Sequence, residues 1–240
     1  MKLLHLYHDI MNLYGDYANV SAMERMLTKN GADVTVDRLS LGDKAVLSDY
    51  DFIFIGSGTE KNQKTVLADF MKYKDELSEY IGSHKLLLMT GNSFEMLGKS
   101  VTDGHGVRYD ALGLYNYTTV EFTGKRITAD IICTASFLDK PLVGFINKSS
   151  EIFGISDSLF QTKFGVGDSE GFHTEGIWDR NFFGTHLTGP ILIKNPHFLS
   201  SLASLLLGRE PNTDHLTYEQ KGYETTLRKL SEREQAKTEG

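Results

Sequence analysis

Apolar and polar positions along about the first 100 residues follow two alternating patterns. Short, continuous apolar runs predict strands that are covered on both faces. Between these runs, residues 16–31 and 65–82 place apolar side chains on one helical face, and the first of these segments ends at Gly31. Strands alternating with helices predict a parallel, doubly wound sheet. The predicted strands are KLLHLYH (2–8), ADVTVDRLS (32–40), DFIFIGSG (51–58) and KLLLMTG (85–91).

The pattern changes after Leu112 to short segments rich in threonine and aromatic residues, which predict antiparallel or mixed strands. The segment HFLSSLASLLLG (197–208) predicts a closing helix, and residues 209–240 are charged and poor in apolar side chains. We therefore expect one α/β domain over 1–208 and a charged, partly helical tail over 209–240 that is more solvated than packed. The β segments are YTTVEFTG (117–124), ITADIICTAS (127–136), LVGFINK (142–148) and FFGTHLTG (182–189).

The composition of the chain limits the kinds of molecule that it is expected to bind. The chain has 240 residues, a net charge of −7 and one cysteine, Cys133. A chain of this length can bury one large core, and its acidity argues against nucleic acid or an anionic membrane as the partner. One cysteine excludes an internal disulfide and a thiolate metal cluster, and its apolar surroundings predict a buried, inert thiol. The first residues show no apolar leader, so we expect a cytoplasmic protein, and we expect neither a cofactor nor a metal.

Two turns lie where the predicted strands end, which is where ligands gather in such sheets. In IGSGTEKNQ (55–63), backbone N–H groups of Gly56, Ser57 and Gly58 could bind an anion or a developing oxyanion, although a short glycine turn is also ordinary structure. In LLLMTGNSFEMLG (86–98), a buried strand runs into a tight turn and a helix start, a place where α/β enzymes mount a nucleophile. No cysteine stands at that turn.

Four stretches carry a resemblance to a known family. In their order and spacing they resemble class I glutamine amidotransferases, and above all the branch with the amidotransferase domain of cobyric acid synthase and the glutaminase subunit of lipid II isoglutaminyl synthase. The resemblance extends through about residue 208 and implies a flavodoxin-like, three-layer, doubly wound mixed sheet. The stretches are LYHDIMNLYGDYANV (6–20), DYDFIFIGSGTEKNQ (49–63), the elbow ending in FEMLG (94–98) and FFGTHLTGPIL (182–192).

Members of that family cleave the amide of glutamine with a cysteine on the elbow, in a pattern like C-G-G-Y-Q-x-L-G, and a histidine in G-T-Y-L-H-G-P. The thiolate attacks the amide carbonyl, and the imidazole protonates the leaving ammonia. Aligned backward from Gly98, the cysteine position falls on Gly91, and the histidine position falls on Thr188. Glycine has no nucleophile, and a threonine hydroxyl is no base near pH 7. The resemblance therefore predicts a family member that has lost glutamine hydrolysis.

Some residues could still supply chemistry. Ser93 lies just past the elbow apex, but its hydroxyl would need a hydrogen-bonded base. His186 precedes Thr188 by two residues and would share its face of a strand, although a structural or partner-facing histidine is the alternative. Arg126 matches an arginine that the resemblance implies would admit or bind glutamine, whereas an arginine on an exposed strand edge would be ordinary. Asp16 is expected to cap the helix that follows it.

Two functions follow from the resemblance. The first is a non-catalytic binding or regulatory subunit of an ATP-dependent synthetase or Mur-ligase-like partner. The second is an active glutaminase subunit that uses Ser93 or groups of the partner to supply ammonia. Glutamine is a candidate ligand in both. We expect the pocket rim, with Asn12, Tyr14, Arg126 and His186, to contact the partner.

Overall fold

The structure is a computed structural model that describes residues 1–238. Its central sheet has nine strands in the order β2-β1-β3-β4-β13-β12-β11-β8-β9. The five strands at one end pair in parallel, as expected for the first part of the chain. They are β1 (Lys2–Leu6), β2 (Thr35–Leu39), β3 (Phe52–Ile55), β4 (Leu86–Thr90) and β13 (Phe182–Thr185).

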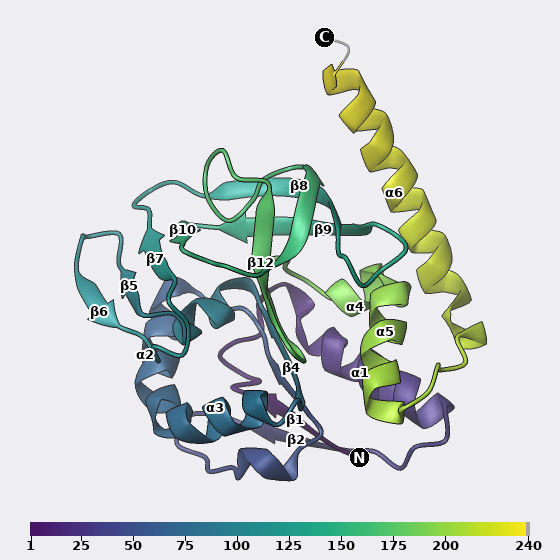
Figure 1. The fold of residues 1–240 in the computed structure, drawn as a ribbon, viewed down its shortest axis with the longest axis horizontal. Helices are drawn as coiled ribbons and strands as arrows, with labels where there is room; N and C mark the ends of the chain where they lie inside the picture. Colours follow the sequence, from purple (N-terminus) through teal and green to yellow (C-terminus); the bar gives the residue numbers. More distant parts are fainter. Residues whose placement is uncertain (239–240) are drawn as a thin grey trace.

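Helices cover both faces of this parallel sheet (Figure 1). Successive side chains of β3 show the division, because Phe52 and Phe54 face one hydrophobic cluster whereas Ile53 and Ile55 face another. The first cluster includes apolar residues of α1 and α5, and the second includes those of α2 and α3. The predicted three-layer α/β fold is therefore confirmed. The helices are α1 (Tyr17–Lys29), α2 (Glu60–Phe70), α3 (Lys74–Gly82), α4 (Ile191–Lys194) and α5 (Pro196–Leu207).

The segment after Leu112 completes the sheet with antiparallel strands, as its pattern predicted. A second sheet, in the order β10-β7-β5-β6, lies beside α2 (Figure 1). The antiparallel strands of the first sheet are β8 (Ile127–Thr134), β9 (Leu142–Lys148), β11 (Ser158–Phe164) and β12 (Thr174–Asp179). The second sheet is mixed, because β5 and β7 pair in parallel. Its strands are β5 (Ser100–Thr102), β6 (Arg108–Asp110), β7 (Thr118–Glu121) and β10 (Ser150–Phe153).

The helix expected to start at the elbow forms as a 3-10 helix and does not continue as an α-helix. This helix, η4, covers Gly91–Leu97, and the chain then enters β5. The carbonyls of Met96 and Leu97 accept hydrogen bonds from the N–H groups of Leu112 and Leu114, at 2.9 and 3.0 Å. A continuing α-helix would need those carbonyls for its own next turn. The other 3-10 turns are η1 (Leu13–Gly15), η2 (Leu47–Asp49), η3 (Met71–Tyr73) and η5 (Asp214–Leu216).

The C-terminal segment forms one helix, α6 (Thr217–Thr238), which extends away from the rest of the fold at its end (Figure 1). Tyr223 and Leu230 are buried against β8, β9 and β11, and Leu227 packs beside them. These apolar residues hold the helix on the sheet, while most of its other described side chains are exposed. Among residues 1–238, no helix is both long and apolar enough to cross a membrane.

Candidate functional site

The two positions that the resemblance aligns with the family's cysteine and histidine lie in one pocket. Gly91 at the end of β4, Thr188 after β13, and Ser57 and Gly58 after β3 all line it. Parallel pairing of β3, β4 and β13 brings these carboxyl ends together. The cavity volume is about 20 Å³, which is room for about one water molecule. The side chains that line the pocket therefore leave little space between them.

The elbow keeps its shape without a reactive group. Gly91 has a φ of +62°, in the left-handed region that a nucleophile elbow also uses. The neighbouring Ser93 is fully buried, and its hydroxyl donates to the carbonyls of Ile55 and Thr90 at 3.1 and 2.8 Å. Ser93 is not among the residues that line the pocket. The structure therefore gives no support to Ser93 as a nucleophile.

The turn after β3 uses its backbone donors within the protein. Ser57 N–H donates to Asp16 Oδ2 at 2.7 Å, and Gly58 N–H donates to Asn92 Oδ1 at 3.0 Å. An oxyanion site needs such donors free to face the developing charge. Gly56 does not line the pocket, and a Cβ there would come within 2.9 Å of Asp16 Cβ. The carboxylate held by this turn is therefore that of Asp16.

Asp16 does not cap α1, contrary to the sequence interpretation. Its side chain makes no capping hydrogen bond. Asn12 Oδ1 accepts from Tyr17 N–H at 2.8 Å instead. The fully buried Asp16 carboxylate accepts from the hydroxyls of Ser57 and Thr90, at 2.7 and 3.1 Å. Burial raises the pKa of Asp16 to about 6, although hydrogen bonds from Ser57, Thr90 and Gly189 lower it.

This pKa predicts an unusual pH dependence of stability. The folded pKa of Asp16 lies above its ordinary value of 3.8, so its favourable contribution is complete below that value and is lost as pH rises through about 6. Relative to Asp16→Asn, wild-type protein should lose on the order of 3 kcal/mol of unfolding free energy between pH 4 and pH 7. Urea unfolding at each pH measures this, with the exposed Asp33→Asn as control. A difference that stays constant with pH would contradict the assignment.

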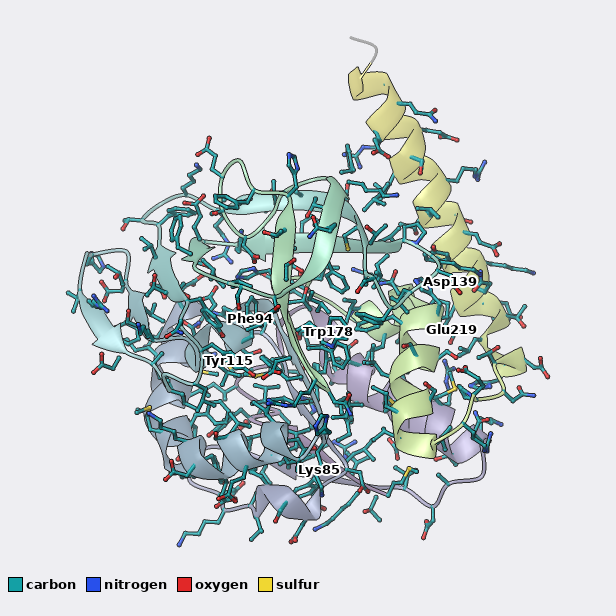
Figure 2. The ribbon with its side chains drawn as sticks, in the orientation of Figure 1. Lys85, Phe94, Tyr115, Asp139, Trp178 and Glu219 are labelled. Carbon is teal, nitrogen blue, oxygen red and sulfur yellow. The ribbon has the colours of Figure 1, made fainter. Side chains whose placement is uncertain are left out.

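Neither Thr188 nor His186 is placed to accept a proton in the pocket. The Thr188 hydroxyl donates to the carbonyl of Phe145 at 3.1 Å, and its N–H donates to the same carbonyl at 2.9 Å. His186 lines the inner part of the pocket but is only 1% exposed. The expectation that it lies on the partner-facing rim is therefore wrong, because three buried carboxylates surround it. Its ring packs on Phe94, in the interior of the molecule (Figure 2), with centroids 4.7 Å apart.

The charges around His186 form a buried cluster. His186 Nε2 lies 3.0 Å from Glu95 Oε1, and Nδ1 lies 3.4 and 3.5 Å from oxygens of Asp168 and Glu175. Burial and the charge of Lys148 lower the pKa of His186, but the Asp168, Glu175 and Glu95 carboxylates close to its ring raise it to about 10. His186 is therefore a cation at neutral pH and has no lone pair with which to accept a proton.

The same cluster contains the set of residues best placed to hold a metal. One ligand atom each from Asp168, Glu175 and His186 lies within 4.8 Å of the others. In the structure, cations of the chain itself occupy this environment: His186 lies between the carboxylates, and Lys148 Nζ donates to the carbonyls of Gly167 and Asp168 at 2.8 and 2.6 Å. The arrangement is that of an internal ion network.

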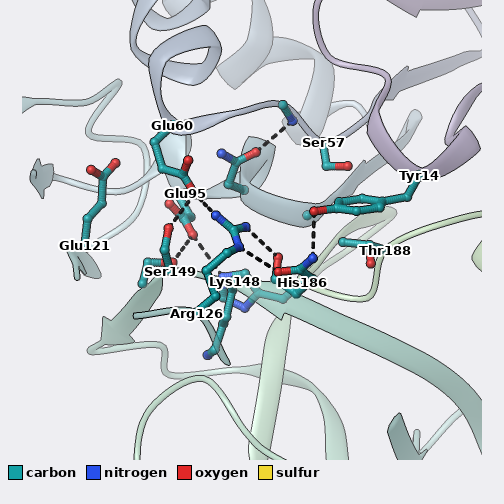
Figure 3. A pocket seen from close by; sticks show the side chains of 15 residues that line it. Tyr14, Ser57, Glu60, Glu95, Glu121, Arg126, Lys148, Ser149, His186 and Thr188 are labelled. Atoms are coloured by element: carbon teal, nitrogen blue, oxygen red, sulfur yellow. Dashed lines mark hydrogen bonds and ion pairs between the residues drawn. The ribbon is translucent and has the colours of Figure 1, made fainter. Parts of the chain in front are cut away.

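Arg126 lies across the mouth of the pocket (Figure 3). Its guanidinium pairs with Glu60 at 2.8 Å and donates to Asn147 Oδ1 at 2.7 Å. Ser149 also donates to Glu60, and Asn147 Nδ2 donates to the Tyr14 hydroxyl at 2.9 Å. Arg126 and Tyr14 remain partly exposed, so both lie on the rim as expected from the sequence. Together these side chains cover the pocket from the solvent side.

Other predicted features lie away from the pocket. Cys133, on β8, is fully buried as predicted, and burial raises the pKa of its thiol well above the ordinary value. Sequence reasoning missed Glu95 and Glu175 as site residues. The available signal was an acidic residue inside an otherwise apolar segment, as in SFEMLG for Glu95.

Two curated proteins resemble this chain over most of its length. The chain is 31% identical over 216 residues to the lipid II isoglutaminyl synthase (glutamine-hydrolyzing) subunit GatD of Streptococcus pneumoniae, covering 89% of this chain and 83% of that protein. It is 29% identical over 195 residues to the GatD subunit of Staphylococcus aureus, covering 81% and 79%.

Solved structures share the fold at low sequence identity. PurLQS from Thermotoga maritima matches with a TM-score of 0.54 at 16% identity, over 86% of this chain and 95% of that one. A glutamine amidotransferase from the same organism matches with a TM-score of 0.52 at 13% identity, over 98% and 97%. The model of the CobB/CobQ-like glutamine amidotransferase domain matches residues 2–196. With the elbow, the turn after β3 and the strand order in place, the chain belongs to the CobB/CobQ-like glutamine amidotransferase domain family.

Proposed function

We propose that this chain is a GatD-like glutamine amidotransferase subunit that does not hydrolyse glutamine. The observation that carries the proposal is the elbow, where Gly91 offers no nucleophile and the neighbouring pocket has room for about one water molecule. The surrounding residues support it. Thr188 is bound to Phe145, and the turn donors after β3 are bound to Asp16 and Asn92. His186 is held as a cation in a buried cluster.

We infer that the chain acts through a partner. The two curated relatives are named as subunits of lipid II isoglutaminyl synthase, and this chain aligns with about four-fifths of each. The inferred partner is an ATP-dependent synthetase of the Mur-ligase type, to which this chain would give structural support or regulation in the cytoplasm. An enzyme fold that has lost its reactive groups can still present the surface around its pocket, which carries Tyr14 and Arg126.

The proposal predicts that the purified chain releases no ammonia from glutamine. Attack on the amide needs a thiolate or an activated hydroxyl, and the pocket presents neither beside a base. Ammonia release should equal that of heat-denatured protein across pH 6 to 9, because the ordinary pKa values of histidine and cysteine lie in this range. Coupled detection of ammonia or glutamate measures it.

Turnover above the heat-denatured control would contradict the proposal. Ser93→Ala then separates the explanations, because loss of that turnover would assign it to the Ser93 hydroxyl in a conformation other than the one described. A glutamine analogue that alkylates active-site cysteines provides a second measurement. We expect no labelling, since Cys133 is buried in the hydrophobic core.

A further inference from the structure

Ser57 occupies the space beside the elbow. It lies in the turn after β3, is 2% exposed, and lines the same pocket as Gly91. Its hydroxyl donates to Asp16 Oδ2 at 2.7 Å, and its N–H donates to the same oxygen at 2.7 Å. Two hydrogen bonds to one buried carboxylate fix both the backbone and the side chain of Ser57. The residue is therefore a rigid wall of the pocket.

A side chain at residue 91 would collide with that wall. An ideal Cβ built on Gly91 overlaps Ser57 Cβ, and it lies 3.1 Å from Ser57 Cα and 3.2 Å from Oγ. No rotamer relieves the overlap, because the backbone fixes the positions of Cα and Cβ. The collision therefore depends on whether residue 57 has a Cβ at all, and not on the chemistry of its hydroxyl.

We propose that Ser57 bars any side chain from the elbow, so that residues 57 and 91 tolerate a Cβ at one position but not at both. This inference rests on the proposed loss of hydrolysis and adds a second barrier to it. The chain lacks a nucleophile at Gly91, and Ser57 also fills the volume into which that nucleophile would project. A cysteine could be restored at the elbow only together with a glycine at residue 57.

A set of double variants tests whether residues 57 and 91 can both carry a Cβ. The measured property is stability rather than activity. Gly91→Ala and Gly91→Cys are each made in three backgrounds: wild type, Ser57→Ala and Ser57→Gly. Strain from a non-glycine residue at φ +62° is common to all three backgrounds and cancels in the comparison. Ser57→Ala is the matched control, because it removes the hydroxyl and keeps the Cβ.

We expect Ser57→Gly, but not Ser57→Ala, to rescue both substitutions at residue 91. Thermal unfolding midpoints of the Gly91→Ala and Gly91→Cys proteins should rise by about 5 °C or more in the Ser57→Gly background, as expected when overpacking is relieved. If Gly91→Cys fails to fold alone, recovery of folded protein with Ser57→Gly is the same result. Equal midpoints in the Ser57→Ala and Ser57→Gly backgrounds would overturn the inference.

Thiol accessibility gives a second readout. In the Ser57→Gly background, the thiol introduced by Gly91→Cys should react with iodoacetamide in the folded protein at least tenfold faster than Cys133, which is fully buried. Reaction of the same thiol at that rate in the wild-type background would also overturn the inference. Neither measurement depends on glutamine hydrolysis. Ammonia release by the unmodified chain would refute the proposed function and leave the exclusion intact.

Discussion

Replacing His186 with glutamine should destabilise the protein by about 3–5 kcal/mol at pH 7, the cost of removing one partner from a buried charge pair. The substitution takes away the cation that lies against Glu95, Asp168 and Glu175. Lys148 alone would then face three buried carboxylates. For a chain of this size the unfolding midpoint should fall by about 6–20 °C. Urea and thermal unfolding measure the loss.

The pH dependence of this loss identifies its cause. Because the folded pKa of His186 is raised from 6.5 to about 10, its stabilising contribution is complete below pH 6.5 and is lost as pH rises through about 10. The difference between wild type and His186→Gln should therefore be largest at pH 6 and shrink steadily toward pH 10. His105→Gln, at an exposed loop histidine, should change stability by less than about 0.5 kcal/mol.

A difference that is the same at pH 6 and pH 10 would show that His186 is neutral in the fold. His186→Ala separates charge from packing, because it also removes the ring that contacts Phe94. It should cost more than His186→Gln at both ends of the pH range. That additional cost should be independent of pH, since the cavity it leaves carries no titrating group.

The parallel half of the fold could be predicted because its signals are local. Strands such as β3 and β4 are continuous apolar runs, and each is followed within a few residues by an amphipathic helix or a glycine turn. The elbow position could be found for the same reason. The helix predicted after it forms only as the 3-10 helix η4, because residues near Leu112, which no local pattern connects to the elbow, supply the donors that end it.

The role of Asp16 shows a different limit. Its place immediately before α1 suggests a cap, but the turn η1 brings Asn12 to the N–H of Tyr17. Asp16 is then free to accept from Ser57 and Thr90, which are 41 and 74 residues away in the sequence. From the sequence, the side chains of Asn12 and Asp16 could each accept a hydrogen bond from the start of α1. The sequence does not show which of the two does so.

His186 illustrates the same point for charge. The period of two within a strand predicted that His186 and Thr188 share one face. Both residues line one pocket, but they do so beyond the end of β13 at Thr185. Whether His186 is exposed there depends on Glu95 from the elbow, Asp168 from a loop and Glu175 from β12. These three carboxylates surround the histidine, so that it is buried and charged. They come from separate parts of the fold, and none of them is close to His186 in the sequence.

Binding to the proposed synthetase partner should depend on Tyr14 and Arg126. These two side chains meet at the pocket mouth through Asn147, and Tyr14 is 44% exposed. A lasting interface buries about 1,600 Å² or more, and tyrosine and arginine carry much of the energy in such contacts. We expect Tyr14→Ala and Arg126→Ala each to weaken the complex about 30-fold, the equivalent of about 2 kcal/mol.

The matched controls are Tyr218→Ala and Arg180→Ala. Tyr218 is 85% exposed on α6, and Arg180 forms an exposed ion pair with Asp179, so each resembles its counterpart but lies outside the pocket. Tagged protein is recovered from the native cells, the partner is identified by mass spectrometry as an ATP-dependent synthetase, and affinity is then measured with purified components. Equal affinity for all four variants would place the interface elsewhere. Recovery of no such synthetase would contradict the proposed partnership.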